Sequence, residues 1–328
     1  MTTITRRRAL ALAGATAAAS ALPRPALSQA WPNRPIRVVL PFGAGGVADV
    51  TARVVTERLG DRIGQRFTIE NVPGAGGATA AQRVLQAPAD GYTLALFSNG
   101  TAVSVGLFNR LPFDPVTEFV PISTLGIFDF VLATGAETGF RTLADLVAAA
   151  RARPGTINIG TVTAGSTQHL SALLFAGEVG IRVEQITFRN TPDAVVALLR
   201  NDVQVVIDSF ASLKASFDDR RAVALATTGS ARSQTLPQVP TVAQAGGPAT
   251  FDVTSWNALF AKAGTPPEAI EGLSAGLRDV LGQADIRARL LDLGIEARWS
   301  QRAELANRLV LDIERWSAVI DRAGIPKQ

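Results

Sequence analysis

A short apolar run that ends at a proline and gives way to glycines constrains this chain more than any other feature. Residues 36–42 predict a buried strand, the glycines at 43, 45 and 46 predict a tight loop, and 48–59 predict a helix. The sequence Gly-Ala-Gly-Gly returns at 74–77 behind a second apolar run. A strand, a glycine loop and a helix N-terminus in this order can present backbone N–H groups to an anion.

Neither glycine loop contains a lysine or an arginine, and the nearest cations are Arg53 and Arg83 in the helices that follow. An anion held here would therefore be bound by main-chain N–H groups and helix dipoles. We interpret Asp49 as a cap that orients the first loop rather than as a contact of the anion. The alternative is that both loops only turn the chain.

The same strand–loop–helix pattern recurs along most of the chain, which predicts parallel sheets covered by helices. The carboxyl-end loops of such sheets gather at one edge, where ligands bind. The length of 328 residues favours two domains. We predict an α/β fold in two lobes, each with a mostly parallel sheet and helices on both faces. The predicted boundaries are 31–130 with 254–328 for lobe 1 and 131–253 for lobe 2.

The first 30 residues predict an export signal. Arg6, Arg7 and Arg8 form a charged head, 9–22 is an apolar run too short to span a bilayer, and Ala30 ends a plausible cleavage site. Both the general secretory route and the twin-arginine route fit. With Arg24, these arginines account for the whole formal excess of +4, so 31–328 is neutral and no nucleic-acid surface is predicted.

The sequence has no cysteine and one histidine, which excludes disulfides and thiolate metal sites and disfavours any metal site. We predict no metal and no cofactor.

A dinucleotide-binding interpretation has some support. Gly43-x-Gly45-x-x-Ala48 fits a G-x-G-x-x-A fingerprint, and Glu70 ends the second strand where a ribose-binding acid would lie. A proline at the strand–glycine junction and the second glycine loop weaken it. An exported NAD(P)-dependent oxidoreductase is therefore kept as the alternative function.

Nucleophilic catalysis is the other enzymatic class. Ser166 and His169 lie three residues apart at a predicted helix start, but the residues around Ser166 do not form a G-x-S-x-G elbow. A helix N-cap explains Ser166 without chemistry, so we predict no catalytic residue. Asp208 ends a buried strand at the same predicted cleft, where it would either meet a ligand or cap its own loop.

The chain resembles the substrate-binding proteins of tripartite tricarboxylate transporters, the Bug proteins, along nearly all of 31–328. The motifs that carry the resemblance are Pro41-Phe42-x-x-Gly45-Gly46-x-x-Asp49, Glu70-Asn71-x-Pro73-Gly74-Ala75-Gly76-Gly77, Ala89-Asp90-Gly91-Tyr92, Gly165-Ser166-x-x-His169 and Leu236-Pro237-x-Val239-Pro240.

The resemblance implies a periplasmic binding protein of the Venus-flytrap type, type II-like, that is not an enzyme and encloses a carboxylate between its lobes. It also implies delivery to membrane permease subunits or a sensor, and we expect a monomer. The residues expected to bind the ligand are Phe42, Gly45, Gly46, Val47, Asp49, Gly74, Ala75, Gly76, Gly77, Ser98, Thr101, Thr161, Thr163, Ser166 and Asp208.

The chain also departs from the family pattern. Where such proteins often have Val-Pro-Tyr-x-Gly, this chain has Gln185-Ile186-Thr187-Phe188-Arg189-Asn190. In addition, Gly43 stands where proline is frequent. Val47 and Ala48 replace a usual polar pair. The distal half of the ligand site is therefore unassigned, and a less polar ligand tail is expected.

Overall fold

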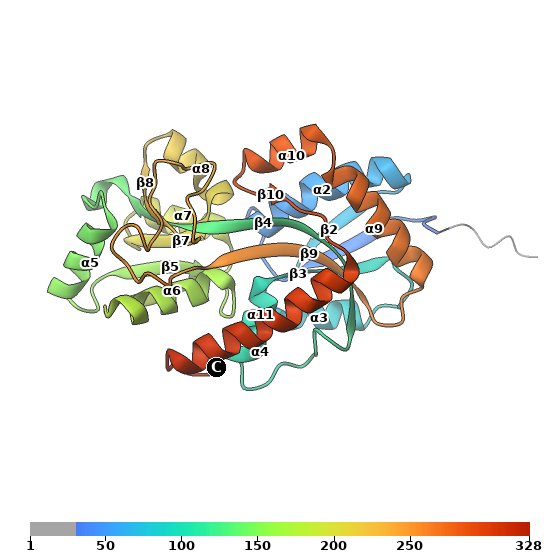
Figure 1. Ribbon diagram of the computed structural model, residues 1–328, viewed down its shortest axis with the longest axis horizontal. Helices are drawn as coiled ribbons and strands as arrows, with labels where there is room; N and C mark the ends of the chain where they lie inside the picture. Colours follow the sequence, from blue (N-terminus) through green and yellow to red (C-terminus); the bar gives the residue numbers. More distant parts are fainter. Residues whose placement is uncertain (1–30) are drawn as a thin grey trace, which may run out of the picture.

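The computed structural model describes residues 31–328 and shows two lobes side by side, joined by two long strands (Figure 1). The elements of lobe 1 up to the first crossing are β1 (Ile36–Leu40), α2 (Val47–Ile63), β2 (Phe67–Asn71), the 3-10 turn η2 (Ala75–Gly77), α3 (Ala78–Leu85), β3 (Thr93–Ser98) and α4 (Asn99–Leu107). Strand β4 (Phe119–Gly135) then leads into lobe 2.

Lobe 2 repeats the strand–helix alternation and returns the chain through β9 (Thr254–Lys262). Its elements are η3 (Ala136–Thr138), α5 (Leu143–Ala152), β5 (Asn158–Val162), α6 (Thr167–Val179), β6 (Glu184–Phe188), α7 (Thr191–Leu199), β7 (Val205–Ser209), α8 (Phe210–Asp218) and β8 (Ala222–Thr227). The chain ends in lobe 1 with α9 (Pro267–Leu281), α10 (Ala284–Leu291), β10 (Glu296–Ala297) and α11 (Arg302–Arg322).

The strands follow the order β2-β1-β3-β9-β4-β7-β5-β6, with β8 and β10 also paired to β4. Pairing is parallel at both ends, in β2-β1-β3 and in β6-β5-β7. In the middle it is antiparallel, because β4 leaves lobe 1 and β9 returns to it in the opposite direction. The parallel parts are as expected, whereas the alternation of motifs gave no sign of this antiparallel centre.

Strand β4 belongs to both lobes. Its residues 119–129 pair with β9, and Phe130 to Thr134 pair with β7. The change of partner between Asp129 and Phe130 marks the bridge between the lobes. One apolar core extends across it, from β1 through Phe130 to Ile159 on β5, so the two lobes share a continuous packed interior.

The final helix α11 braces the crossing strand and the third loop of lobe 1 (Figure 1). The Trp256 indole of β9 donates to Asp312 at 2.7 Å, and the Trp316 indole donates to Asn99 at 2.6 Å. The side-chain Nδ2 of Asn99 in turn donates to the carbonyl of Thr254 at 3.2 Å. These bonds hold the start of α4 and helix α11 against β9, the strand that returns the chain to lobe 1.

The turn before α9 uses no side-chain cap. Pro266 lies at the cap position of α9 and makes no side-chain capping bond, although the preceding Thr265 is a residue type that often caps helices. The Thr265 hydroxyl instead donates to the carbonyl of Lys262 at 2.8 Å.

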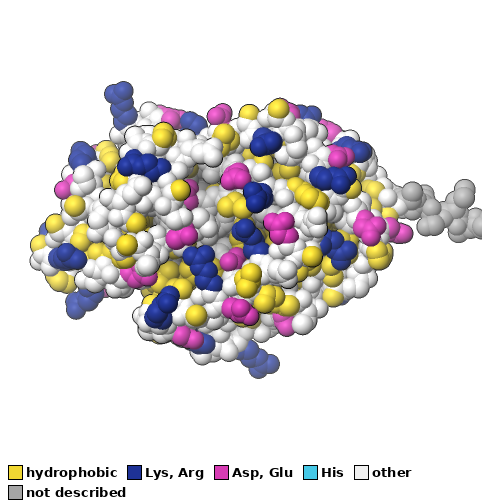
Figure 2. Space-filling view, in the orientation of Figure 1, with side chains coloured by type: hydrophobic (Ala, Val, Ile, Leu, Met, Phe, Trp, Pro, Cys, Tyr) yellow, Lys and Arg dark blue, Asp and Glu magenta, His cyan; other side chains and the backbone are white. Residues whose placement is uncertain are grey.

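The surface carries interspersed charges on the face that Figure 2 shows, with no large patch of one sign. Among residues 31–328, no helix is long and apolar enough to cross a membrane. The predicted export signal lies outside the described residues.

Candidate ligand-binding site

The loop between β1 and α2 ends in a helix N-terminus that no side chain caps. Helix α2 starts at Val47, and the residue at its N-cap position is Gly46, which has no side chain that could cap the helix. Within residues 31–328, the amides of Gly46, Val47 and Ala48 have no hydrogen-bond acceptor. All three residues line a cavity between the lobes. The positive end of the helix dipole and its free N–H groups therefore face that cavity.

Asp49 fixes this loop from behind and does not line the cavity. Its carboxylate accepts from the Gly45 amide, Arg53 Nε and Asn71 Nδ2, each at 3.0 Å. Burial raises the pKa of Asp49, but the hydrogen bonds from Arg53, Gly45 and Asn71 outweigh it, so the net pKa lies below its usual value. Asp49 thus orients the loop by accepting from the Gly45 amide and does not cap α2 itself.

Replacing Asp49 with alanine is expected to lower the free energy of unfolding by about 2 kcal/mol, because it leaves the Gly45 amide without an acceptor and leaves Asn71 Nδ2 bonded only to the carbonyl of Phe42. The lowered pKa means that this stabilisation is present above the unfolded value of 3.8 and is lost as pH falls through the folded value. Urea unfolding at neutral pH measures it. Asp61→Ala, at an exposed position of the same helix, is the control and should change little.

The second glycine loop contacts the opposite lobe directly. Gly76 and Gly77 adopt positive φ angles of 61° and 71°, which favour glycine. The Gly76 amide donates to the carbonyl of Ala164 in the β5–α6 loop at 3.2 Å, and Ser104 Oγ donates to the carbonyl of Gly165 at 3.2 Å. The lobes are therefore in contact here, in a closed arrangement.

The two glycine loops line neighbouring cavities rather than one. Gly46 and Val47 line the cavity described above, whereas Gly74, Gly76 and Gly77 line a smaller one beside it. Phe42 and Thr163 line both. Gly45, Ala75 and Asp49 line neither. The amides of Gly45, Gly76 and Gly77 are already bonded within the protein, so a direct grip of both loops on one carboxylate requires rearrangement.

The third loop of lobe 1 is built by a capping box. Ser98 Oγ accepts from the Gly100 amide at 3.1 Å, and Thr101 Oγ1 accepts from the Ser98 amide at 3.4 Å. Ser98 lines the larger cavity and Thr101 lines the smaller one.

The expected residues of lobe 2 divide between the cavity walls and the layer behind them. Thr163 lines both cavities and Ser166 lines the smaller one. Thr161 is buried, its hydroxyl has no partner among the described residues, and it lines neither cavity. Asp208 also lies behind the wall, where it accepts from Thr191 Oγ1 at 3.0 Å and is 2% exposed. Burial raises the pKa of Asp208. Its visible role is to hold Thr191, which does line the cavity.

Ser166 and His169 do not form a nucleophile–base pair. Ser166 Oγ donates to the carbonyl of Val162 at 2.7 Å and accepts from the backbone amide of His169 at 3.1 Å, as a helix N-cap does. The imidazole Nδ1 has no partner among residues 31–328, and burial lowers the pKa of His169.

Ser166→Ala is expected to lower the free energy of unfolding by about 1 kcal/mol through loss of the N-cap. Urea denaturation checks this, and Ser166→Thr should restore most of the loss because threonine also caps helices. An esterase activity that disappears in Ser166→Ala would contradict this assignment.

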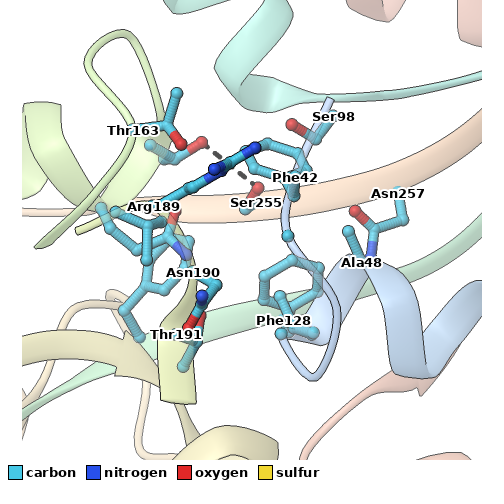
Figure 3. A pocket seen from close by; sticks show the side chains of 17 residues that line it. Phe42, Ala48, Ser98, Phe128, Thr163, Arg189, Asn190, Thr191, Ser255 and Asn257 are labelled. Atoms are coloured by element: carbon cyan, nitrogen blue, oxygen red, sulfur yellow. Dashed lines mark hydrogen bonds between the residues drawn. The ribbon is translucent and has the colours of Figure 1, made fainter. Parts of the chain in front are cut away.

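Several residues that line the larger cavity were not predicted from the sequence. Figure 3 shows the Arg189 side chain reaching between Thr163 and Phe42, with Asn190 and Thr191 beside it and Phe128 on the opposite side. The only signal for Arg189 and Asn190 was their departure from the family pattern. The remaining wall residues that were not predicted are Gly43, Ala48, Phe130, Val162, Thr167, Gln168, Ser255 and Asn257.

In this closed arrangement the cavity holds little. The space open to the centre of a water molecule is about 20 Å³, which is room for about one water. Phe42, Phe128, Phe130 and Val162 form an apolar part of its wall, and within residues 31–328 no aspartate or glutamate lines it. The site thus combines free N–H groups, hydroxyls and aromatic surface without a fixed negative charge, which suits an anion with an apolar body.

The fold and the cleft are those of the two-lobed periplasmic binding proteins, and comparison with known proteins gives the family of this chain. A family model described as the tripartite tricarboxylate transporter family receptor matches residues 51–325. The periplasmic binding protein BugD superposes with a TM-score of 0.87 at 25% identity, covering 91% of this chain and all of that one.

Two further solved structures contain organic acids. Rpa4515 of R. palustris with adipate has a TM-score of 0.86 at 30% identity and covers 90% of this chain and 99% of its own. MatC of Rhodopseudomonas palustris with bound malate has a TM-score of 0.83 at 32% identity and covers 88% and 100%.

The chain belongs to the tripartite tricarboxylate transporter receptor family, the Bug proteins. This is a family of periplasmic solute receptors, not of enzymes, so the family predicted from the motifs is confirmed. The dinucleotide alternative has no support from these relatives. In addition, its ribose-binding candidate Glu70 is already paired with Arg37 at 3.2 Å and Arg83 at 3.6 Å.

Proposed function

We propose that this protein is an extracytoplasmic receptor that binds a small organic acid in the cleft between its lobes. The observation that carries the proposal is the uncapped N-terminus of α2, whose free amides at Gly46, Val47 and Ala48 face the interlobe cavity. Free N–H groups at a helix N-terminus are a ready anion site. Adipate and malate in the two related structures belong to the same ligand class.

Ligand binding is proposed to be coupled to closure of the lobes about the two crossing strands, with 31–130 and 254–328 in one lobe and 131–253 in the other. Because the closed cavity has room for about one water, the ligand must enter while the lobes are apart and settle as they close. Phe42 and Thr163 would then contact the ligand from opposite lobes. Asp49 and Asp208 would act behind them, by holding the α2 loop and Thr191.

Location and partners complete the proposal. Residues 1–30 would direct export and be removed near Ala30, leaving a monomeric periplasmic protein. The closed, loaded form would dock on permease subunits of a tripartite tricarboxylate-type system or on a sensor protein. The family membership supports this role.

Native mass spectrometry of freshly purified protein tests the function. We expect a bound organic acid, and addition of that acid at roughly a hundred times its Kd should raise the free energy of unfolding by about 2.7 kcal/mol. Recovery of a nicotinamide dinucleotide in place of an acid would contradict the proposal.

A further inference from the structure

We propose that Arg189 binds a second carboxylate of the ligand, so that the receptor prefers dicarboxylates to monocarboxylates of the same length. This inference rests on the proposed function, because it concerns the far end of the same cavity. It assigns the half of the site that the departure from the family pattern left open.

The first support is the charge of the cavity wall. Within residues 31–328, Arg189 is the only lysine or arginine that lines the larger cavity, and no acidic residue lines it with Arg189. The Arg189 guanidinium also has no ion pair or hydrogen bond among the described residues; its neighbour Asn190, by contrast, is bonded to Asp193. An exposed arginine at the cavity without a carboxylate partner is free to bind one from a ligand.

The second support is the rigid backbone on both sides of Arg189. The Thr163 amide donates to the carbonyl of Phe188 at 3.1 Å, which joins the end of β6 to the β5–α6 loop. Asn190 Oδ1 accepts from the Asp193 amide at 2.9 Å as the N-cap of α7. Arg189 therefore projects from a fixed point, and Figure 3 shows its side chain lying across the cavity between Thr163 and Phe42.

The third support is the order of polar and apolar surfaces. The α2 amides belong to lobe 1 and Arg189 belongs to lobe 2, so the two positive features approach a closed-in ligand from different lobes. Phe42, Phe128 and Phe130 supply apolar wall for the same cavity. This arrangement matches two carboxylates joined by a hydrocarbon segment. It also means that a diacid would bridge the lobes by charge at both ends.

Isothermal titration with adipate and hexanoate, which share one chain length, tests the inference. Wild-type protein should bind adipate at least roughly ten-fold more tightly than hexanoate. Arg189→Gln should weaken adipate binding by roughly 10- to 100-fold and leave hexanoate within about two-fold, so that the preference disappears. Arg189→Lys should recover part of it, because lysine keeps the charge but not the planar fork.

The matched control is Arg182→Gln, which makes the same charge change at an exposed arginine before β6, outside the cavity wall. It should leave both affinities unchanged. Thermal unfolding of each variant verifies that Arg189→Gln remains folded, as expected for a side chain without bonds to the described residues.

The possible outcomes distinguish a failure of the role assigned to Arg189 from a failure of the proposed receptor function. An equal loss for both acids would place Arg189 on the first carboxylate, and no loss for either would remove it from the site. Either result overturns this inference while the receptor function stands. Wild-type protein that binds no acid from succinate to suberate, and none of the matching monoacids, would overturn the proposed function and the inference with it.

Discussion

Gly43→Ala is expected to weaken binding of the organic acid by roughly 5- to 150-fold while each lobe stays folded. A Cβ atom at Gly43 would lie 2.5 Å from the Cβ of Asn190 and 3.1 Å from the carbonyl oxygen of Arg189. Both atoms belong to the opposite lobe, and neither can move away by a side-chain rotation. Overpacking of this kind costs about 1–3 kcal/mol, and about 1.4 kcal/mol corresponds to ten-fold in affinity.

The loss should arise from impaired closure. Small-angle scattering with saturating ligand should report a larger radius of gyration for Gly43→Ala than for the wild type. Gly177→Ala is the control, because this glycine of α6 has no heavy atom within 4 Å of an added Cβ. It should bind as the wild type does. A Gly43→Ala variant with wild-type affinity would show that these lobes do not close in the arrangement described.

Asp129→Asn is expected to raise the free energy of unfolding by up to about 3 kcal/mol near neutral pH, because each ten-fold change in an acid dissociation constant between the two states corresponds to about 1.4 kcal/mol. Asp129 lies where β4 changes partner between the lobes, and it lines a third cavity of about 210 Å³ together with Arg232 and Glu296. Burial, with a smaller contribution from the charge of Asp252, raises the pKa of Asp129 from 3.8 to about 6.

The sign follows from proton linkage. The folded state holds the Asp129 proton more tightly than the unfolded state does. Protonated Asp129 therefore stabilises the fold fully below pH 3.8, and this stabilisation is lost as pH rises through about 6. Urea unfolding of wild type and variant across this range should give equal stabilities near the acid end and a widening gap toward neutral pH. Asp61→Asn makes the same charge change at an exposed position of α2 and is the matched control. A gap that is constant with pH would contradict the raised pKa.

The architecture follows from the sequence because strand, loop and helix signals agree locally. The buried runs at Ile36–Leu40 and Val205–Ile207 and the cap at Ser166 all depend on neighbours within a few residues. The antiparallel centre of the sheet does not. The residues around β4 and β9 do not indicate that these two strands pair, because the pairing joins residues far apart in the chain.

The first half of the site was also accessible from the sequence. The glycine loop before α2 and the role of Asp49 in orienting it are local features, and the structure contains both. The partition of the two glycine loops between neighbouring cavities is not local. It depends on Phe42 lying between them and on the contact of Gly76 with Ala164 in the other lobe.

The two departures from the family pattern illustrate what a sequence leaves unconnected. Gly43 stands where proline is frequent, and Asn190 stands where the pattern has glycine. In the structure they face each other across the cleft, with no room for a larger residue at Gly43. A small residue in one lobe thus accommodates a large one in the other. Arg189, next to Asn190 in the chain, lines the same cavity, which the separate motifs could not show.

The most direct test of the account is a crystal structure of the protein with adipate. We expect lobes closed around adipate, with a cavity wider than the space for about one water described here. One carboxylate should lie within about 3.2 Å of the amides of Val47 and Ala48, and the other should pair with Arg189. Adipate bound away from the α2 N-terminus, with the amides of Gly46, Val47 and Ala48 facing only solvent, would contradict the central claim.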